Sequence, residues 1–322
     1  MIGIGIEIGG TKLQAAVVRA PGEVLLCSVA AVDAAAGARG VRDVLAPRLA
    51  ALLVAWERDP RYEPPGAAGV GFGGPVDRGR GIVAASFHVA GWNDFPLAAW
   101  VSERLGGVAV TLENDTNAAA LAEATAGAGR DARRVFYTNC GSGIGGGFVI
   151  AGALYHGRGP GEMEIGHLRL GLEAGILEDV ASGWAIDRRA RAEATAHPRG
   201  GIAVCAAGSL PSARHVAAAA AAGDEVARDI LDAAARHYAL ALSHVTHLLN
   251  PDVIVLGGGV AEIGAAWRDR VAGFLPDYLM EPMRPGPDVR LSTLGGDVVP
   301  VGAALVALQA RGVEPLTPPH PP

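Results

Sequence analysis

Short apolar runs alternate with glycine-containing turns at the start of the chain. The runs are IGIGIEI, LQAAVVR and VLLCSVAAV, and the turns between them are GGTK (residues 9–12) and APGE (residues 20–23). Apolar runs with β-branched residues, bounded by turn residues, are typical of strands. We therefore predict a β-meander over residues 2–32.

The same order of elements returns at residues 134–156. The run RVFYTNC is followed by the turn GSGIGG, a second run, GFVIA, and the tight turn GA before LYH. Each half then has a further run that ends in glycines, AAGVGFGGPVD at 67–77 and PDVIVLGGGVAE at 251–262. The two halves look like copies of one unit.

The clearest predicted helix covers residues 223–250. Its apolar residues recur mostly at intervals of three or four, the period of a core-facing stripe; they are Val226, Ile230, Ala234, Ala241, Val245 and Leu248. Asn250-Pro251 is expected to end the helix. His244 and His247 lie one turn apart and could share a metal ion, but no third ligand is near, so ordinary helix-face histidines are favoured.

Length and composition are those of an ordinary two-domain protein. A chain of 322 residues is longer than most single cores. A net charge of −6 without a basic block argues against a nucleic-acid partner. Three scattered cysteines, Cys27, Cys140 and Cys205, favour neither disulfides nor a cysteine zinc site and indicate a cytoplasmic protein. No signal or membrane segment is visible, and the proline-rich tail, 313–322, is expected to be disordered.

Gly141, Gly143 and Gly146 have the G-x-G-x-x-G spacing of the dinucleotide fingerprint. That fingerprint requires the glycines to open a helix, whereas the following GFVIAGALYHG favours a strand. Glu164, about 20 positions on, keeps an NAD-binding oxidoreductase open as an alternative. The favoured interpretation is a pair of glycine-rich hairpin turns whose backbone N–H groups face phosphate oxygens. Two plain tight hairpins are the structural alternative.

The ordered set of motifs resembles the ROK family of sugar kinases. The motifs are IEIGGTK (6–12), GFGGPVD (71–77), GW (91–92), LENDTNAAALAE (112–123), GSGIGGG (141–147), GEMEIGH (161–167), LEDVASG (177–183) and LGGGV (256–260). The resemblance implies an α/β fold of the actin-like ATPase (ribonuclease H-like) type, with two lobes and a central cleft. The family's repressor branch has a helix-turn-helix ahead of the first phosphate turn, and we expect none here because that turn begins at residue 9.

The resemblance also implies a division into lobes and an assembly. We expect a small lobe over 1–113, joined by a C-terminal helix at about 300–312, and a large lobe over 114–299. Relatives are often dimers, so a homodimer is expected.

LENDTN follows the predicted strand VAVTL and precedes an alanine-rich helix. An aspartate at a strand end is well placed for a general base, although Asn and Asp at this place are also natural helix N-caps. By resemblance, Asp115 matches the catalytic base and Asn114 a contact with a sugar hydroxyl.

GEMEIGH and LEDVASG are rich in carboxylates, with a histidine between them. Such groups suit sugar hydroxyls, which both donate and accept hydrogen bonds, although a solvated acidic loop has the same composition. By resemblance, Glu164, His167 and Glu178 bind the sugar, together with Gly74 of GFGGPVD.

The resemblance implies Mg·ATP as the phosphoryl donor. The implied nucleotide-binding residues are Glu7, Gly9, Gly10, Thr11 and Lys12 in the first phosphate turn, Gly141, Ser142 and Gly143 in the second, and Gly257, Gly258 and Gly259 near the adenosine. Mg²⁺ is expected near Glu7.

This chain departs from the family pattern at several positions. Glu7 stands where an Asp is usual, Gly73 replaces a Pro, and His88 replaces an Asn. The family's zinc segment is absent, because GHLRLGLEAGILEDVASG contains no cysteine. No zinc is expected, and Glu162, Glu173 or Asp179 would then orient the His167 ring.

The sequence therefore predicts an ATP-dependent kinase that phosphorylates a hexose at its primary hydroxyl. Glucose, N-acetylglucosamine and N-acetylmannosamine remain open as the hexose. Glu7 and His88 leave a second hypothesis, a sugar-binding regulatory protein that has lost turnover.

Overall fold

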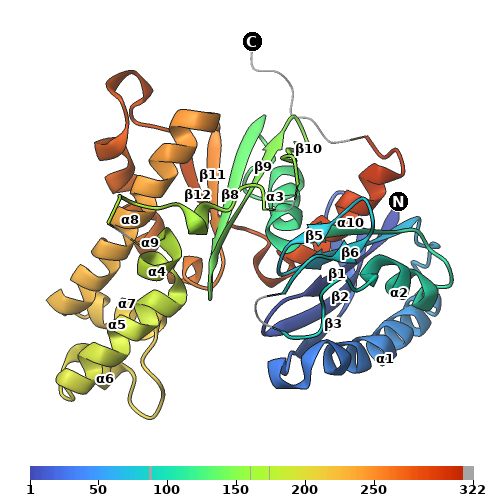
Figure 1. The fold of residues 1–322 in the computed structure, drawn as a ribbon, viewed down its shortest axis with the longest axis horizontal. Coiled ribbons are helices and arrows are strands. Elements are labelled where there is room, and N and C mark those ends of the chain that lie inside the picture. Colours follow the sequence, from blue (N-terminus) through green and yellow to red (C-terminus); the bar gives the residue numbers. More distant parts are fainter. Residues whose placement is uncertain (87–88, 160, 174, 315–322) are drawn as a thin grey trace. The chain divides into compact units, whose positions relative to one another are not determined.

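A computed structural model describes residues 1–86, 89–159, 161–173 and 175–314. Two five-stranded sheets and a two-stranded ribbon carry the fold (Figure 1). The first sheet has the order β3-β2-β1-β4-β7. Its strands are β1 (Ile2–Ile8), β2 (Lys12–Arg19), β3 (Glu23–Ala31), β4 (Ala67–Phe72) and β7 (Val110–Asn114). The ribbon pairs β5 (Val76–Asp77) with β6 (Ile82–Val83).

The second sheet has the order β10-β9-β8-β11-β12. Its strands are β8 (Arg134–Cys140), β9 (Ile144–Ile150), β10 (Ala153–Leu154), β11 (Val253–Gly257) and β12 (Asp288–Leu291). In each sheet three consecutive strands form a meander. Two further strands lie beside the first strand of that meander and run parallel to it. The predicted meander and the predicted duplication are both confirmed.

The helices lie between and after these strands. They are α1 (Gly37–Glu57), α2 (Leu97–Arg104), α3 (Asp115–Thr125), α4 (Leu177–Ala181), α5 (Gly183–Ala196), α6 (Gly201–Cys205), α7 (Ala213–Ala221), α8 (Glu225–Leu249), α9 (Ala265–Phe274) and α10 (Val298–Ala310). The glycine turn after β8 leads into strand β9, so it lacks the helix that a dinucleotide fingerprint requires.

Helix α8 matches the predicted helix, with Asp224 as N-cap and Asn250 in the left-handed conformation at its end. Four of the six stripe residues are buried, but Val226 and Leu248 are 45% and 82% exposed. These two expectations are wrong because the residues lie in the first and last turns of α8. The elements that pack against the middle of the helix do not cover these side chains.

Contacts divide the chain into two compact units. One contains residues 1–133, 147–162 and 293–322, and the other contains 134–146 and 163–292. The lobes expected from the sequence divide the chain elsewhere, at residue 113, whereas α3 groups with the first unit because it packs against α10. The expected lobe boundaries stay a prediction.

The first unit is organised around the sheet between α1 and α10. Alternate residues of β1 face opposite sides, so Ile4 and Ile6 pack in the core that includes Leu45 of α1, while Gly5 faces α10. A Cβ on Gly5 would lie 1.8 Å from the Pro300 carbonyl oxygen. The glycines in this apolar strand therefore permit direct contact between strand and helix backbones.

Gly302 makes the equivalent contact between α10 and α3, because a Cβ there would lie 1.7 Å from the Ala118 carbonyl oxygen. We expect Gly302→Ala to lower the free energy of unfolding by about 3 kcal/mol or more, since backbone must move to admit the methyl group. Gly273→Ala in α9 is the matched control, because no atom lies within 4 Å of its added Cβ. Urea unfolding followed by circular dichroism measures both; equal losses in the two variants would contradict the packing argument.

Candidate active site

The first phosphate turn joins β1 to β2 and is a tight hairpin. The Gly9 N–H donates to the Lys12 carbonyl at 2.9 Å. The Lys12 ammonium lies 2.6 Å from Glu7 Oε2 and donates to Gln14 Oε1 at 3.0 Å and to the Gly296 carbonyl at 2.6 Å. Three partners thus hold the lysine beside the turn.

Gln14 and Asp297 extend this network. Gln14 pairs with Glu7 in the β1–β2 register, and its amide donates to Asp297 Oδ1 at 2.5 Å. Asp297 ends the short 3-10 turn Gly295–Asp297 just before α10. The sequence analysis missed both residues. Hairpin register was a signal for Gln14, but nothing local pointed to Asp297, 283 residues away.

Glu7 is an unusual carboxylate because it is 9% exposed. Burial raises the pKa of Glu7 from its ordinary 4.5 to about 7, with Lys12 opposing the change and the charges of Asp115 and Asp297 adding to it. Desolvation penalises the charged form more than one lysine compensates. A carboxylate here offers the hard oxygen ligands that Mg²⁺ takes, so the residue fits the expected metal role.

Asn114 and Asp115 lie where β7 meets α3. Asn114 Oδ1 accepts from the N–H groups of Thr116 and Asn117 at 2.9 and 3.1 Å, so it is the N-cap. Its amide nitrogen donates to the Gly74 carbonyl at 3.4 Å. Asp115 is the first residue of the helix, where the dipole favours a carboxylate.

The ends of β1, β4 and β7 bring two predicted site residues, Glu7 and Asp115, together with Gly73. The Gly73 N–H donates to the Ile8 carbonyl at 2.9 Å, and a Cβ on Gly73 would lie 3.3 Å from Asp115 Oδ2. Glu7 is close enough to Asp115 for their charges to interact. Parallel strands present their carboxyl ends at one edge, and open α/β sheets bind ligands at such edges.

Gly74 must be a glycine for its conformation. Its φ is 155°, and a Cβ would lie 2.9 Å from the Ala85 carbonyl oxygen. His88, the third departure from the family pattern, lies outside the described residues.

The second unit brings its own predicted residues together around Glu178. Glu178 Oε2 accepts from the Ile144 N–H at 2.9 Å. The same oxygen lies 2.5 Å from the position of a Cβ on Gly143 and 3.3 Å from that of a Cβ on Gly166. Glu178 therefore contacts both the second glycine turn and the GEMEIGH segment.

Glu164 precedes a short 3-10 turn (Ile165–His167) that ends at His167, and both residues are exposed. The His167 N–H donates to the Glu164 carbonyl at 3.1 Å. Among the described residues no hydrogen bond joins the His167 ring to Glu162, Glu173 or Asp179, and no group of three metal ligands includes His167. Glu162 is instead engaged in the first unit.

Gly257 ends β11, and Gly258 after it lies against the end of β8. Gly258 has a φ of 79°, and a Cβ there would lie 2.6 Å from the Cys140 carbonyl oxygen. The Val260 N–H donates to that carbonyl at 2.9 Å. The second sheet thus places this glycine run next to the turn that begins at Gly141.

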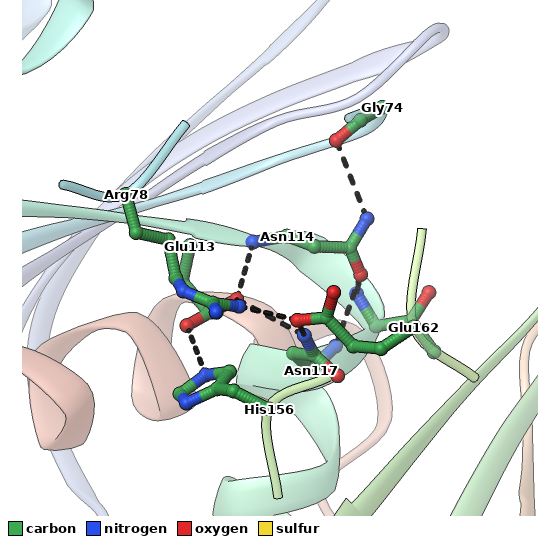
Figure 2. Close-up of polar contacts among 8 residues, drawn as sticks. Gly74, Arg78, Glu113, Asn114, Asn117, His156 and Glu162 are labelled. Carbon is green, nitrogen blue, oxygen red and sulfur yellow. Dashed lines mark hydrogen bonds and ion pairs between the residues drawn. The ribbon is translucent and has the colours of Figure 1, made fainter. Parts of the chain in front are cut away.

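A network of charged and polar side chains surrounds the start of α3 (Figure 2). Glu113 Oε1 accepts from the Asn117 amide at 3.0 Å, and Oε2 lies 2.9 Å from His156 Nε2. Glu162 Oε1 accepts from Arg78 and from the Asn117 amide. The sequence analysis considered only Glu162 of these five residues, and as a partner for His167.

The Glu113 carboxylate stays charged despite its burial. Burial alone would raise its pKa, but hydrogen bonds from His156 and Asn117, with the charge of Arg78, outweigh that effect and hold the pKa of Glu113 below its ordinary value. Glu113, His156 and Glu162 also have the spacing of metal ligands, but Arg78 already contacts both carboxylates.

Glu7 predicts a specific dependence of stability on pH. Because folding raises its pKa, the folded chain keeps a proton that the unfolded chain has lost between pH 4.5 and about 7. The contribution of Glu7 to stability is therefore full below pH 4.5 and is lost as pH rises through about 7. One pH unit corresponds to about 1.4 kcal/mol, so the loss over this window is at most about 3.5 kcal/mol.

We expect the free energy of unfolding of wild type, relative to Glu7→Gln, to decline over this window. Denaturant unfolding of both proteins at pH 5, 6, 7 and 8 measures it. A difference that is constant with pH would show that Glu7 does not titrate there.

Comparisons with known proteins match nearly the whole chain to one family. The ROK family model matches residues 3–310. Glucokinases from Streptomyces coelicolor and Thermotoga maritima are each 32% identical, over 94% and 96% of this chain and 96% and 98% of theirs. A ROK family glucokinase from Streptomyces griseus, solved with glucose and AMPPNP, has a TM-score of 0.83 and 32% identity, covering 96% of this chain and all of its own. No described helix is long and apolar enough to cross a bilayer. The chain belongs to the ROK family.

Proposed function

We propose that the chain, as a hexose kinase of the ROK family, transfers the γ-phosphoryl group of ATP to the primary hydroxyl of the sugar. Glucokinases similar over nearly the whole chain, and a relative solved with glucose and AMPPNP, support the reaction class. The observation that carries the proposal is the position of Asp115, at the start of α3 beside Gly73 and near Glu7. The proposed base and the proposed phosphate turn therefore lie at the same edge of the first sheet.

Asp115 is proposed as the general base. Its carboxylate accepts the proton of the primary hydroxyl as that oxygen forms a bond to the γ-phosphorus and the bond to the ADP oxygen breaks. The N-terminal end of α3 favours the ionised form of the carboxylate. The cap is made by Asn114, so the Asp115 carboxylate is not required for that role.

The nucleotide is proposed to bind at the glycine turns. The Gly9 and Gly141 N–H groups donate within their own turns, to the Lys12 and Gly143 carbonyls. The phosphates are proposed to lie against the other backbone groups of residues 9–12 and 141–143, with the adenosine against Gly257 to Gly259. Mg²⁺ supplies charge neutralisation on the phosphates, and Glu7 offers a carboxylate for it. Lys12, held by Glu7, Gln14 and Gly296, adds a positive charge beside the first turn.

The sugar is proposed to contact Asn114, Gly74, Glu164, His167 and Glu178. Asn114 uses its carbonyl oxygen as the cap and donates one amide hydrogen to the Gly74 carbonyl, which leaves its second amide hydrogen for a hydroxyl. Glu178 uses Oε2 for the second turn, which leaves Oε1 as an acceptor. Asn114 and Glu178 therefore each hold nearby backbone in place in addition to their proposed contact with the sugar.

A sugar-binding regulatory protein without turnover is the second candidate. The buried, ion-paired Glu7 favours it, because a half-protonated carboxylate is a weaker ligand for Mg²⁺ than an ionised aspartate. A coupled ADP-release assay over glucose, N-acetylglucosamine and N-acetylmannosamine tests both candidates. Sugar binding by calorimetry without ADP release would favour the regulatory role.

We expect Asp115→Asn to lower kcat by roughly 10²- to 10⁴-fold, because the amide cannot accept the proton. Sugar affinity and thermal stability should change little, since Asn114 still caps α3. Steady-state kinetics and calorimetry measure these quantities, with Glu103→Gln as an exposed carboxylate control. Near-full turnover in Asp115→Asn would rule out the proposed base.

His167 is expected to act without zinc. Elemental analysis should find no stoichiometric zinc, and activity should survive chelation once Mg²⁺ is restored, because the segment after His167 contains no cysteine. His167→Ala should lower kcat/KM for the sugar at least about tenfold, the effect of losing one charge-assisted hydrogen bond. One zinc per chain would contradict the metal-free site, and unchanged kcat/KM would remove His167 from sugar binding.

A further inference from the structure

Five residues from three segments of the first unit form the network in Figure 2. Arg78 follows the strand β5, Glu113 and Asn117 lie on either side of the start of α3, and His156 and Glu162 come from the segment after β10. The side chains of Glu113 and Glu162 are 2% and 6% exposed. Two buried carboxylates are costly unless both are paired.

Arg78 and Asn117 are the groups that the two carboxylates share. Arg78 Nη1 forms an ion pair with Glu162 Oε1 and lies 3.5 Å from Glu113 Oε1. Asn117 Nδ2 lies 3.0 Å from Glu113 Oε1 and 3.2 Å from Glu162 Oε1. Arg78 and the Asn117 amide each contact both carboxylates. A change at Glu162 must therefore alter how these two groups contact Glu113.

Those two residues hold the backbone of the proposed base. The Asn114 N–H donates to Glu113 Oε1 at 3.0 Å, and the Asn117 N–H donates to the cap oxygen of Asn114. Asp115 lies between these two anchored amides. The network thus fixes the backbone of the first turn of α3 and makes no contact with the sugar or the nucleotide in the proposed reaction.

Glu162 is also two residues before Glu164, one of the proposed sugar contacts. The same short segment therefore supplies a sugar contact and an anchor for the helix that carries the base.

We infer that Glu162 is a positioning residue for Asp115, acting through Arg78, Asn117 and Glu113. The inference rests on the proposed function for its catalytic consequence, but its structural part concerns only the first turn of α3. Glu162→Gln keeps the shape of the side chain and removes the charge that pairs with Arg78. Arg78 and the Asn117 amide then contact Glu113 more and residue 162 less. The first turn of α3 therefore loses its fixed position.

The kinetic test is a double-variant cycle. Glu162→Gln should lower kcat by about tenfold to a hundredfold, the scale for misplacing a catalytic group by a fraction of an ångström to an ångström. In the Asp115→Asn background the same change should have little further effect, because the group that it positions is gone. An equal loss of kcat in both backgrounds, or no loss in wild type, would overturn the inference.

The structural test does not depend on turnover. Amide hydrogen exchange at Asn114, Thr116 and Asn117 should be faster in Glu162→Gln than in wild type, because these N–H groups bond to Glu113 and Asn114. The control Glu103→Gln neutralises an exposed carboxylate and should leave exchange unchanged. Unchanged exchange in Glu162→Gln would contradict the positioning role.

These two tests separate the inference from the proposed function. Absence of sugar phosphorylation in wild type would overturn the proposed function, and the exchange result would still decide whether Glu162 anchors α3. If Glu162→Gln does not fold, Arg78→Ala removes the same ion pair from the part-exposed side and takes its place in both tests. A lower melting temperature with unchanged kcat and exchange would indicate a structural role only and would contradict the inference.

Discussion

The close contact of α10 with its neighbours sets the geometry of the first unit. Three glycines make it possible, because Cβ atoms on Gly5, Gly69 and Gly302 would lie within 1.8 Å of backbone carbonyl oxygens. The helix therefore lies directly on the backbones of β1 and β4, and α3 lies directly on α10. As a result the start of α10 reaches Lys12 and Gln14, and the start of α3 brings Asp115 beside Gly73.

Much of this fold was predictable because its signals are local. Apolar runs and glycine turns fix the meander of residues 2–32 and its repeat, and both follow from neighbours along the chain. The role of Gly5 was not predictable, because its partner, Pro300, is distant in the sequence. The exposure of Val226 and Leu248 was missed for a related reason: helical period predicts a stripe, but which turns of it are covered depends on other helices.

The candidate site shows the same limit. A strand end followed by a helix start pointed to Asp115 and to a cap at Asn114, and the resemblance added the predicted sugar contact of Asn114. The cap uses the side-chain oxygen of Asn114, so it leaves the amide nitrogen, which also donates to the Gly74 carbonyl, for the predicted contact. Glu178 was predicted by resemblance, but its bond to the Ile144 N–H was not. Arg78 and Glu162 are 84 residues apart, and neither stands in a pattern that points to the other.

The acidic groups around Asp115 are balanced in two different ways. Glu113 has Arg78, His156 and Asn117, and these partners keep it charged although it is buried. For Glu7, burial raises the pKa more than Lys12 lowers it, and the negative charges of Asp115 and Asp297 add to the rise. The phosphate turn therefore carries excess negative charge, which a divalent cation accompanying the nucleotide would offset. Such a cation would favour the ionised form of Glu7 and release its proton near neutral pH. If Mg²⁺ binds at this turn as proposed, Glu7, the glutamate that departs from the family pattern, would link metal binding to proton release.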